Sequence, residues 1–164
     1  MSEIRRLNMS VPSYIKIEGI PGSVNIIGRE ETIQVLAFDH KIHIPVNRKD
    51  GHSVAARIHD DFVFTKNIDK ASPSLYNCLC NGNVIPKVEL FWYEIKPTGS
   101  EEIYFTHILE NVRIISINTI MPDANNQKNE QNKHMERIAL RYEKITWRFE
   151  EGNIEYSDSW KENR

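Results

Sequence analysis

The chain has 164 residues and a formal net charge of −2, with charges of both signs spread along its length. This length fits one domain with an ordinary core. The absence of a strongly basic stretch argues against a nucleic-acid binder. No stretch approaches the ~20 apolar residues of a membrane-spanning helix. We therefore expect no nucleic acid and no membrane insertion.

The first residues differ in character from the rest of the chain. Residues 1–8 are polar, show no periodicity and lack the apolar run of a secretory signal peptide. We expect a flexible N-terminal extension over residues 1–8, a single domain over residues 9–164, and either a cytoplasmic location or export by a dedicated machine.

Residues 14–17 form a first β-prone run, which Gly19, Pro21 and Gly22 end.

A second strand-like run covers residues 31–45, where apolar and polar residues alternate. The alternation loses its phase at residues 38–40, which predicts a bulge or bend there. Residues 46–56 form a polar loop with Asp50-Gly51 at its turn, and strand character resumes over residues 58–68. This pattern predicts a hairpin with an unusually long connection.

One short helix of about two turns is expected after residue 72. Ser72 is a suitable N-cap, Pro73 suits the first turn, and Gly82 lies just past the end. Leu75 and Leu79 lie four residues apart and share a face. The two cysteines, Cys78 and Cys80, lack the spacing of a zinc site and are expected to pack as small apolar residues in or beside this helix.

Further strands are expected over residues 84–95, 103–109 and 112–120, followed by a polar surface excursion over residues 121–134. Residues 84–95 are apolar on both faces, which predicts a strand covered on both sides. Ile138, Leu140 and Tyr142 share one phase, and Ile145, Trp147 and Phe149 continue one residue out of phase. That slip predicts a bulge or sharp coil at residues 143–144.

About nine strand-like runs and one helix predict a mainly β fold. We expect a two-sheet β-sandwich or partly closed β-barrel, with one short α-helix and a projecting extended loop. The last strand should run from residue 154 to residue 160. Trp92 and Trp147 fall within strand alternation and are expected in the core, whereas Trp160 suits a surface or an interface.

No catalytic or metal-binding motif emerges. His40 and His43 lie three apart, which on a strand places them on opposite faces. Asp60 and Asp61 are adjacent, so on a strand they face apart and do not form a carboxylate pair. The chain contains no nucleophile elbow and no glycine-rich phosphate loop. We therefore expect no enzyme activity, no cofactor and no metal site.

Several blocks resemble the haemolysin-coregulated protein (Hcp) family of type VI secretion systems. They include REETIQVLAFDHKIHIP, FTKNIDKASPSL, VELFWYEI and LRYEKITW, with GNI and DSW near the end. The blocks follow the family's order over about residues 9–160. The resemblance implies a small β-barrel with one helix and a projecting loop. It also implies six-subunit rings that stack into the tube of a contractile injection machine.

The same resemblance implies partners and a location. Partners would be further copies of the chain in a homohexamer and in stacked rings, the sheath, spike and baseplate proteins, and small effectors in the lumen. The protein would be cytoplasmic before assembly and then secreted through the apparatus. Candidate subunit-contact residues lie in the loop over residues 46–56: Asn47, Arg48, Lys49, Asp50 and His52. The alternative is a monomeric β-sandwich binding module, either an adaptor or a lectin-like domain.

Overall fold

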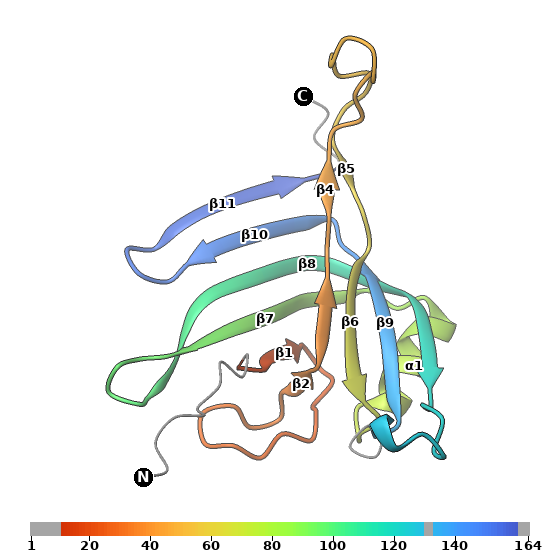
Figure 1. Ribbon diagram of the computed structural model, residues 1–164, viewed down its shortest axis with the longest axis vertical. Helices are drawn as coiled ribbons and strands as arrows, with labels where there is room; N and C mark the ends of the chain where they lie inside the picture. Colours follow the sequence, from red (N-terminus) through yellow and green to blue (C-terminus); the bar gives the residue numbers. More distant parts are fainter. Residues whose placement is uncertain (1–10, 130–132, 161–164) are drawn as a thin grey trace.

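The computed structural model describes residues 11–129 and 133–160. Within them the chain forms eleven β-strands, the helix α1 (Ser72–Asn81) and a 3-10 helix (Gln127–Asn129). Figure 1 shows how the strands and the helix are arranged. The strands are β1 (Ser13–Ile17), β2 (Ile33–Val35), β3 (Ala37–Asp39), β4 (Ile42–His43), β5 (Ile58–His59), β6 (Phe62–Asn67), β7 (Ile85–Ile95), β8 (Glu101–Ile120), β9 (Met135–Arg141), β10 (Lys144–Phe149) and β11 (Ile154–Ser159). No helix of this described part is long and apolar enough to cross a membrane. The expected flexible extension over residues 1–8 lies outside the described residues.

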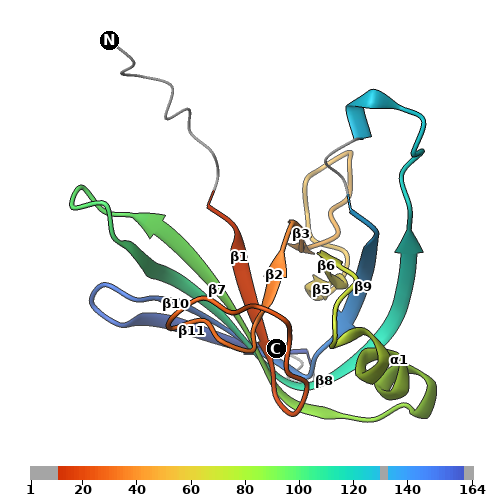
Figure 2. The ribbon, with the colours of Figure 1, turned by 90° about the horizontal axis from the view of Figure 1, so that it is seen from below.

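The long strand β8 belongs to two sheets. Its first part pairs with β7 and β10, and its last part pairs with β9 from Arg113 onward, with a register shift between Ile114 and Ser116. Figure 2 shows β8 curving from one sheet into the other. The sequence predicted a break at Asn111, but this residue lies inside β8 with a φ of 53°. Asn tolerates this left-handed conformation better than most residues, so the strand continues through it.

A second junction closes the sheet order into a ring. β2 pairs with β1, whereas β3, directly after it, pairs with β6 on the other side of the molecule. Leu36, between them, donates its backbone N–H to the carbonyl of Thr65 at 2.8 Å. The order β2-β1-β7-β8-β9-β6-β3 therefore returns to its start. The prediction of a mainly β fold with one short helix is confirmed.

The core lies between the inward faces of these strands. On β6 every second residue is buried, and each buried residue pairs with a buried residue of β9. The pairs are Phe62 with Leu140, Phe64 with Ile138, and Lys66 with Glu136. Strands β1, β7 and β8 add Ile15, Val88, Leu90 and Leu109, each at most 1% exposed. Period-2 patterning thus creates one continuous core.

Helix α1 packs against β8 and buries the side chain of its Leu75 completely. Gly82 ends the helix in the left-handed conformation, as predicted. The predicted N-cap is wrong: Ala71 occupies that position, and the Ser72 hydroxyl bonds the buried Lys66 and Glu136 instead. The ten residues make nearly three turns rather than two. Cys78 packs against the core, but Cys80 is exposed.

Other boundaries differ from the sequence prediction. The run over residues 31–45 is divided into β2, β3 and β4, with an interruption at residues 40–41. The bulge or coil predicted at residues 143–144 is a break at residues 142–143, one residue earlier. This break separates β9 from β10. Strand β7 is not covered on both sides: Phe91 and Tyr93 are only half-buried and Ile95 is 59% exposed.

Candidate functional site

A two-stranded arm projects from the barrel. We define the arm as residues 42–59, from β4 to β5, and its tip as residues 46–53. Figure 1 shows it rising well above the β10–β11 hairpin. Val46 and Ser53 form an isolated β-bridge, and Asn47 donates its N–H to the carbonyl of His52 at 2.8 Å. The predicted long hairpin is therefore present, and backbone hydrogen bonds close its tip.

The tip holds every predicted subunit-contact residue. Asn47, Arg48, Lys49, Asp50 and His52 are all exposed. The side chain of Asn47 accepts a hydrogen bond from the N–H of Lys49 at 2.9 Å, and that of Asp50 accepts one from the N–H of His52 at 3.0 Å. These local bonds shape the turn. The structure thus brings the five residues together on one protrusion.

The arm also exposes apolar side chains that the sequence analysis did not single out. Its exposed apolar residues are Ile44 (57%), Val46 (54%), Val54 (65%) and Ile58 (42%). A two-stranded arm has no interior in which to bury them. Several exposed apolar side chains on one protrusion make it a candidate interaction site.

A second uncovered surface lies at β11. This strand pairs with β10 along one edge, and in the described part of the chain no strand pairs with its other edge. Ile154 and Tyr156 on β11 are each 67% exposed, and Phe149 on β10 is 40% exposed. An open edge presents unpaired N–H and C=O groups to a further strand. Together with its apolar side chains, this edge is a candidate contact for another chain.

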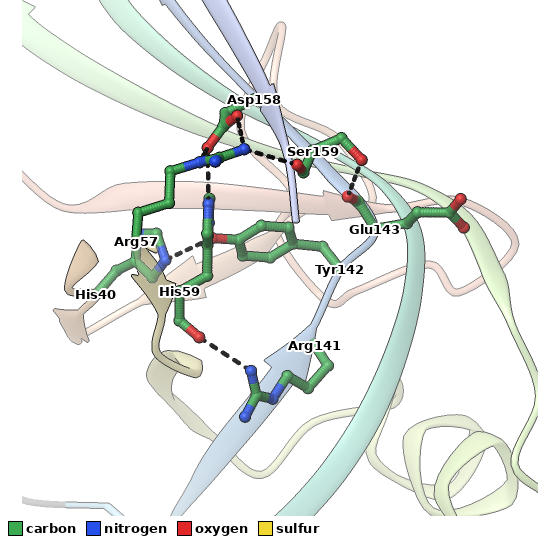
Figure 3. A network of polar contacts seen from close by, with 8 residues as sticks. All are labelled: His40, Arg57, His59, Arg141, Tyr142, Glu143, Asp158 and Ser159. Carbon is green, nitrogen blue, oxygen red and sulfur yellow. Dashed lines mark hydrogen bonds and ion pairs between the residues drawn. The ribbon is translucent and has the colours of Figure 1, made fainter. Parts of the chain in front are cut away.

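The base of the arm is tied to the barrel by a polar network, which Figure 3 shows. His59 of β5 contacts the hydroxyl of Tyr142 through Nδ1 at 2.6 Å and Oδ2 of Asp158 through Nε2 at 2.8 Å. His40 contacts the same hydroxyl through Nε2 at 2.9 Å. Arg57 donates to both carboxylate oxygens of Asp158 and, at 3.0 Å, to the carbonyl of Ser159.

Burial and neighbouring charges shift the pKa values of three groups in this network. Hydrogen bonds from Arg57, assisted by His59, hold the pKa of Asp158 below its ordinary value, so the carboxylate is ionised. Burial, with the nearby Asp158 charge, raises the pKa of Tyr142, so the phenol keeps its proton. Burial, with the neighbouring His59, lowers the pKa of His40. The network therefore joins an ionised acid to a neutral phenol.

The sequence analysis missed this network because its members are far apart in the chain. Tyr142 lies 83 residues from His59 and 102 residues from His40. The one available signal was the apolar phase that turns Tyr142 inward, where a hydroxyl needs a partner. In residues 11–129 and 133–160, no group of His, Cys, Asp or Glu side chains is arranged to hold a metal ion.

The adjacent carboxylates do not act as a pair. Asp61 bonds Arg141 at 2.9 Å, whereas Asp60 lies 3.9 Å from His43.

A surface cleft of ≈ 590 Å³ is lined by residues that include Asn111, Glu143 and Trp160. Asn111 donates to Glu143 at 3.2 Å, so polar groups of the cleft already bond one another. The cleft therefore does not favour the binding-module alternative.

Comparison with known proteins gives the family. The family described as "Type VI secretion system effector, Hcp" matches residues 14–149. The "Major exported protein" of Pseudomonas aeruginosa is 32% identical over 93% of this chain and 97% of its own length. A mutant of the Hcp1 protein from E. coli EAEC 042 is 40% identical, with a TM-score of 0.82 over 92% of this chain and 99% of that one. The secreted protein Hcp3 from Pseudomonas aeruginosa is 30% identical, with a TM-score of 0.73 over 92% and 99% of the two chains.

These matches agree in sequence, in length and in fold. They cover both sheets, the helix and the arm rather than one shared motif. The family is structural rather than enzymatic, which agrees with the prediction of no enzyme activity. The chain therefore belongs to the Hcp family of type VI secretion system proteins.

Proposed function

We propose that this chain is the subunit of a hexameric ring, and that the rings stack into the inner tube of a type VI secretion system. As an Hcp-family protein it is exported by that system, in line with the exported and secreted relatives. The tube is then a structural conduit that leaves the cell together with its cargo. Small effectors in the lumen and the sheath, spike and baseplate proteins are the proposed partners.

The observation that carries this proposal is a pair of distinct uncovered surfaces. The arm leaves Ile44, Val46 and Val54 exposed, and the edge at β11 leaves Ile154 and Tyr156 exposed. A head-to-tail assembly needs two different complementary surfaces on each subunit, and it closes into a ring when the rotation allows. One chain with two separate contact surfaces meets that need.

We further propose a division of labour within the arm. Its exposed apolar residues Ile44, Val46 and Val54 contribute, together with the edge at β11, to ring closure, because apolar burial gives strong association. The charged tip, with Arg48 and Lys49, contributes to stacking, because exposed charges add little affinity and are screened by salt. Stacking is then weaker than ring closure. Size-exclusion chromatography over a salt series should separate stacked rings into hexamers before hexamers dissociate.

Charge reversal at the tip tests the proposal. The double variant Arg48→Glu/Lys49→Glu should still form rings, but its export by an active type VI apparatus should fall at least about tenfold, the loss expected for about 1.4 kcal/mol of contact. Lys128→Glu, in the exposed 3-10 helix after β8, is a charge-reversal control away from the arm and should be exported normally. Export of the double variant at the level of the unaltered chain would overturn the role given to the tip.

A further inference from the structure

We propose that His40, Tyr142, His59 and Asp158 form an acid-sensitive latch that accepts one extra proton and opens at the second, detaching His40 from the barrel and loosening the first strand of the arm, which follows it. The latch is a property of a single chain. Only its consequence, that acid loosens contacts made by the arm, rests on the proposed function.

The geometry joins four separate segments through side chains. His40 lies between β3 and β4, His59 on β5, Tyr142 in the break between β9 and β10, and Asp158 on β11 (Figure 3). Tyr142 is 4% exposed and His59 6% exposed, so water does not readily replace these bonds. β5 and the residue that leads into β4 therefore meet at one phenol oxygen.

When each imidazole carries a single proton, the protons of this chain of hydrogen bonds have one consistent order. The ionised Asp158 only accepts, so Nε2 of His59 carries a proton and donates to it. Nδ1 of a neutral His59 then accepts from the Tyr142 hydroxyl, which has one proton to give. Nε2 of His40 must donate to the same hydroxyl oxygen. Every donor faces an acceptor.

One added proton is tolerated if the order reverses. A protonated His59 donates from Nδ1 to the Tyr142 oxygen and still donates from Nε2 to Asp158. The Tyr142 hydroxyl then turns to donate to Nε2 of His40, which stays neutral with its proton on Nδ1. All three contacts survive, and the pair of His59 with Asp158 gains charge.

A second proton has no place in the network. With His40 and His59 both charged, two N–H groups donate to one phenol oxygen, and the Tyr142 proton loses its acceptor. The two positive charges also repel each other in a half-buried site. The lowered pKa of His40, caused by burial and then by His59, agrees with this exclusion.

Other charged groups around the arm base do not remove the conflict. Asp39 and Asp60 favour a charged His40 but do not outweigh burial and His59. Other charged or titratable groups at the arm base include Lys41 directly after His40, His43 beside Asp60, Asp61 paired with Arg141, Arg57 on Asp158, and His107, whose pKa is lowered by burial and by His40.

The two strands of the arm respond differently. β5 keeps the bonds of Arg57 to Asp158 and of Arg141 to the His59 carbonyl, the latter at 2.9 Å. Neither bond needs the Tyr142 hydroxyl. His40 reaches that hydroxyl and packs against the ring of Phe62, whereas the backbone after it is held to β5 by the short β4–β5 pairing and by the N–H of Asp60, which donates to the carbonyl of Lys41 at 2.9 Å. The second proton removes the tie at His40, so the short β4–β5 pairing opens more often and residues 40–46 lose protection first.

Hydrogen exchange read by mass spectrometry tests the latch. Protection factors, corrected for intrinsic exchange, are compared for residues 40–46 and for β8 as pH falls from about 8 to about 4.5, across the ordinary histidine range. We expect the protection of residues 40–46 to fall at least about tenfold while that of β8 persists. Size exclusion at each pH reports assembly separately, so failure of the ring proposal is distinguishable from failure of the latch.

Three variants make the test decisive. In His40→Gln the amide can donate or accept but cannot charge, so protection of residues 40–46 should persist to the lowest pH. His52→Gln, the same replacement at the exposed tip, should behave as the unaltered chain. Tyr142→Phe should expose residues 40–46 at neutral pH. Identical pH profiles for His40→Gln and the unaltered chain would overturn the latch, as would constant protection in the unaltered chain.

Discussion

At the residue scale, the barrel interior holds a lysine. Lys66 has no exposed surface, and its Nζ lies 2.8 Å from Oε2 of Glu136, 2.9 Å from Asp69 and 3.0 Å from the Ser72 hydroxyl. Lys66 occupies an inward position of the period-2 pattern that also buries Phe62 and Phe64. The charge is retained because the whole ammonium group is satisfied.

Breaking this pair should destabilise the chain strongly. In Lys66→Met, Glu136 remains 2% exposed without its cation, which costs about 3 kcal/mol or more. The double variant Lys66→Met/Glu136→Leu removes both charges and should be more stable than the single variant. Urea unfolding measures both free energies. A loss below about 1 kcal/mol for Lys66→Met would contradict this account.

Proton uptake by His107 should make the free energy of unfolding depend on pH. Its Nδ1 accepts from the indole N–H of Trp92 at 2.9 Å, so the folded state holds it neutral, and burial, with His40, lowers its pKa to about 4. The unfolded chain takes up this proton first as pH falls below 6.5. Stability should therefore fall between pH 6.5 and about 4, by about 3 kcal/mol from this residue.

A variant isolates that contribution. His107→Asn keeps an acceptor near Nδ1 for Trp92 but has no titratable group. The variant should be less stable at neutral pH because it leaves space in the core. Its free energy of unfolding in urea, measured over the same pH range, should decline less steeply than that of the unaltered chain. Equal slopes would show that His107 is not the source.

At the scale of single helices and strands, the sequence correctly predicts features that depend only on neighbouring residues. Gly82 ends α1 because its φ of 63° suits glycine, and the phase slip after Tyr142 separates β9 from β10. The sequence does not predict features that depend on a residue far away in the chain. Ser72 reads as an N-cap, yet Glu136, 64 residues away, takes its hydroxyl. The sequence predicted that both faces of β7 are covered, because apolar residues alone do not show whether another element packs on them.

Two glycines should separate backbone strain from steric clash. In Gly82→Ala the added Cβ meets no atom within 4 Å, so only the left-handed φ is penalised, at about 1 kcal/mol. In Gly22→Ala the Cβ would lie 2.3 Å from the carbonyl oxygen of Thr32, which is backbone and cannot move aside. The second variant should lose about 2–3 kcal/mol. Thermal unfolding ranks the two, and the opposite order would contradict the close approach at Gly22.

At the scale of the whole molecule, composition and periodicity predict a mainly β fold but not its closure. The closure depends on β8 and on β2 with β3 each serving two sheets, and those pairings are long-range. The arm was predicted from its polar loop, and its five candidate residues do share one tip. The open edge at β11 was not predicted, because an edge strand and a central strand show the same alternation.

The central claim is that copies of this chain close into a hexameric ring. Sedimentation-velocity analysis of the purified chain, with negative-stain imaging of the same fractions, tests it most directly. Six copies of 19.2 kDa predict a species of about 115 kDa that appears as an annulus with a central hole. A single species of 19.2 kDa at every concentration and salt, with no annulus in the images, would contradict it.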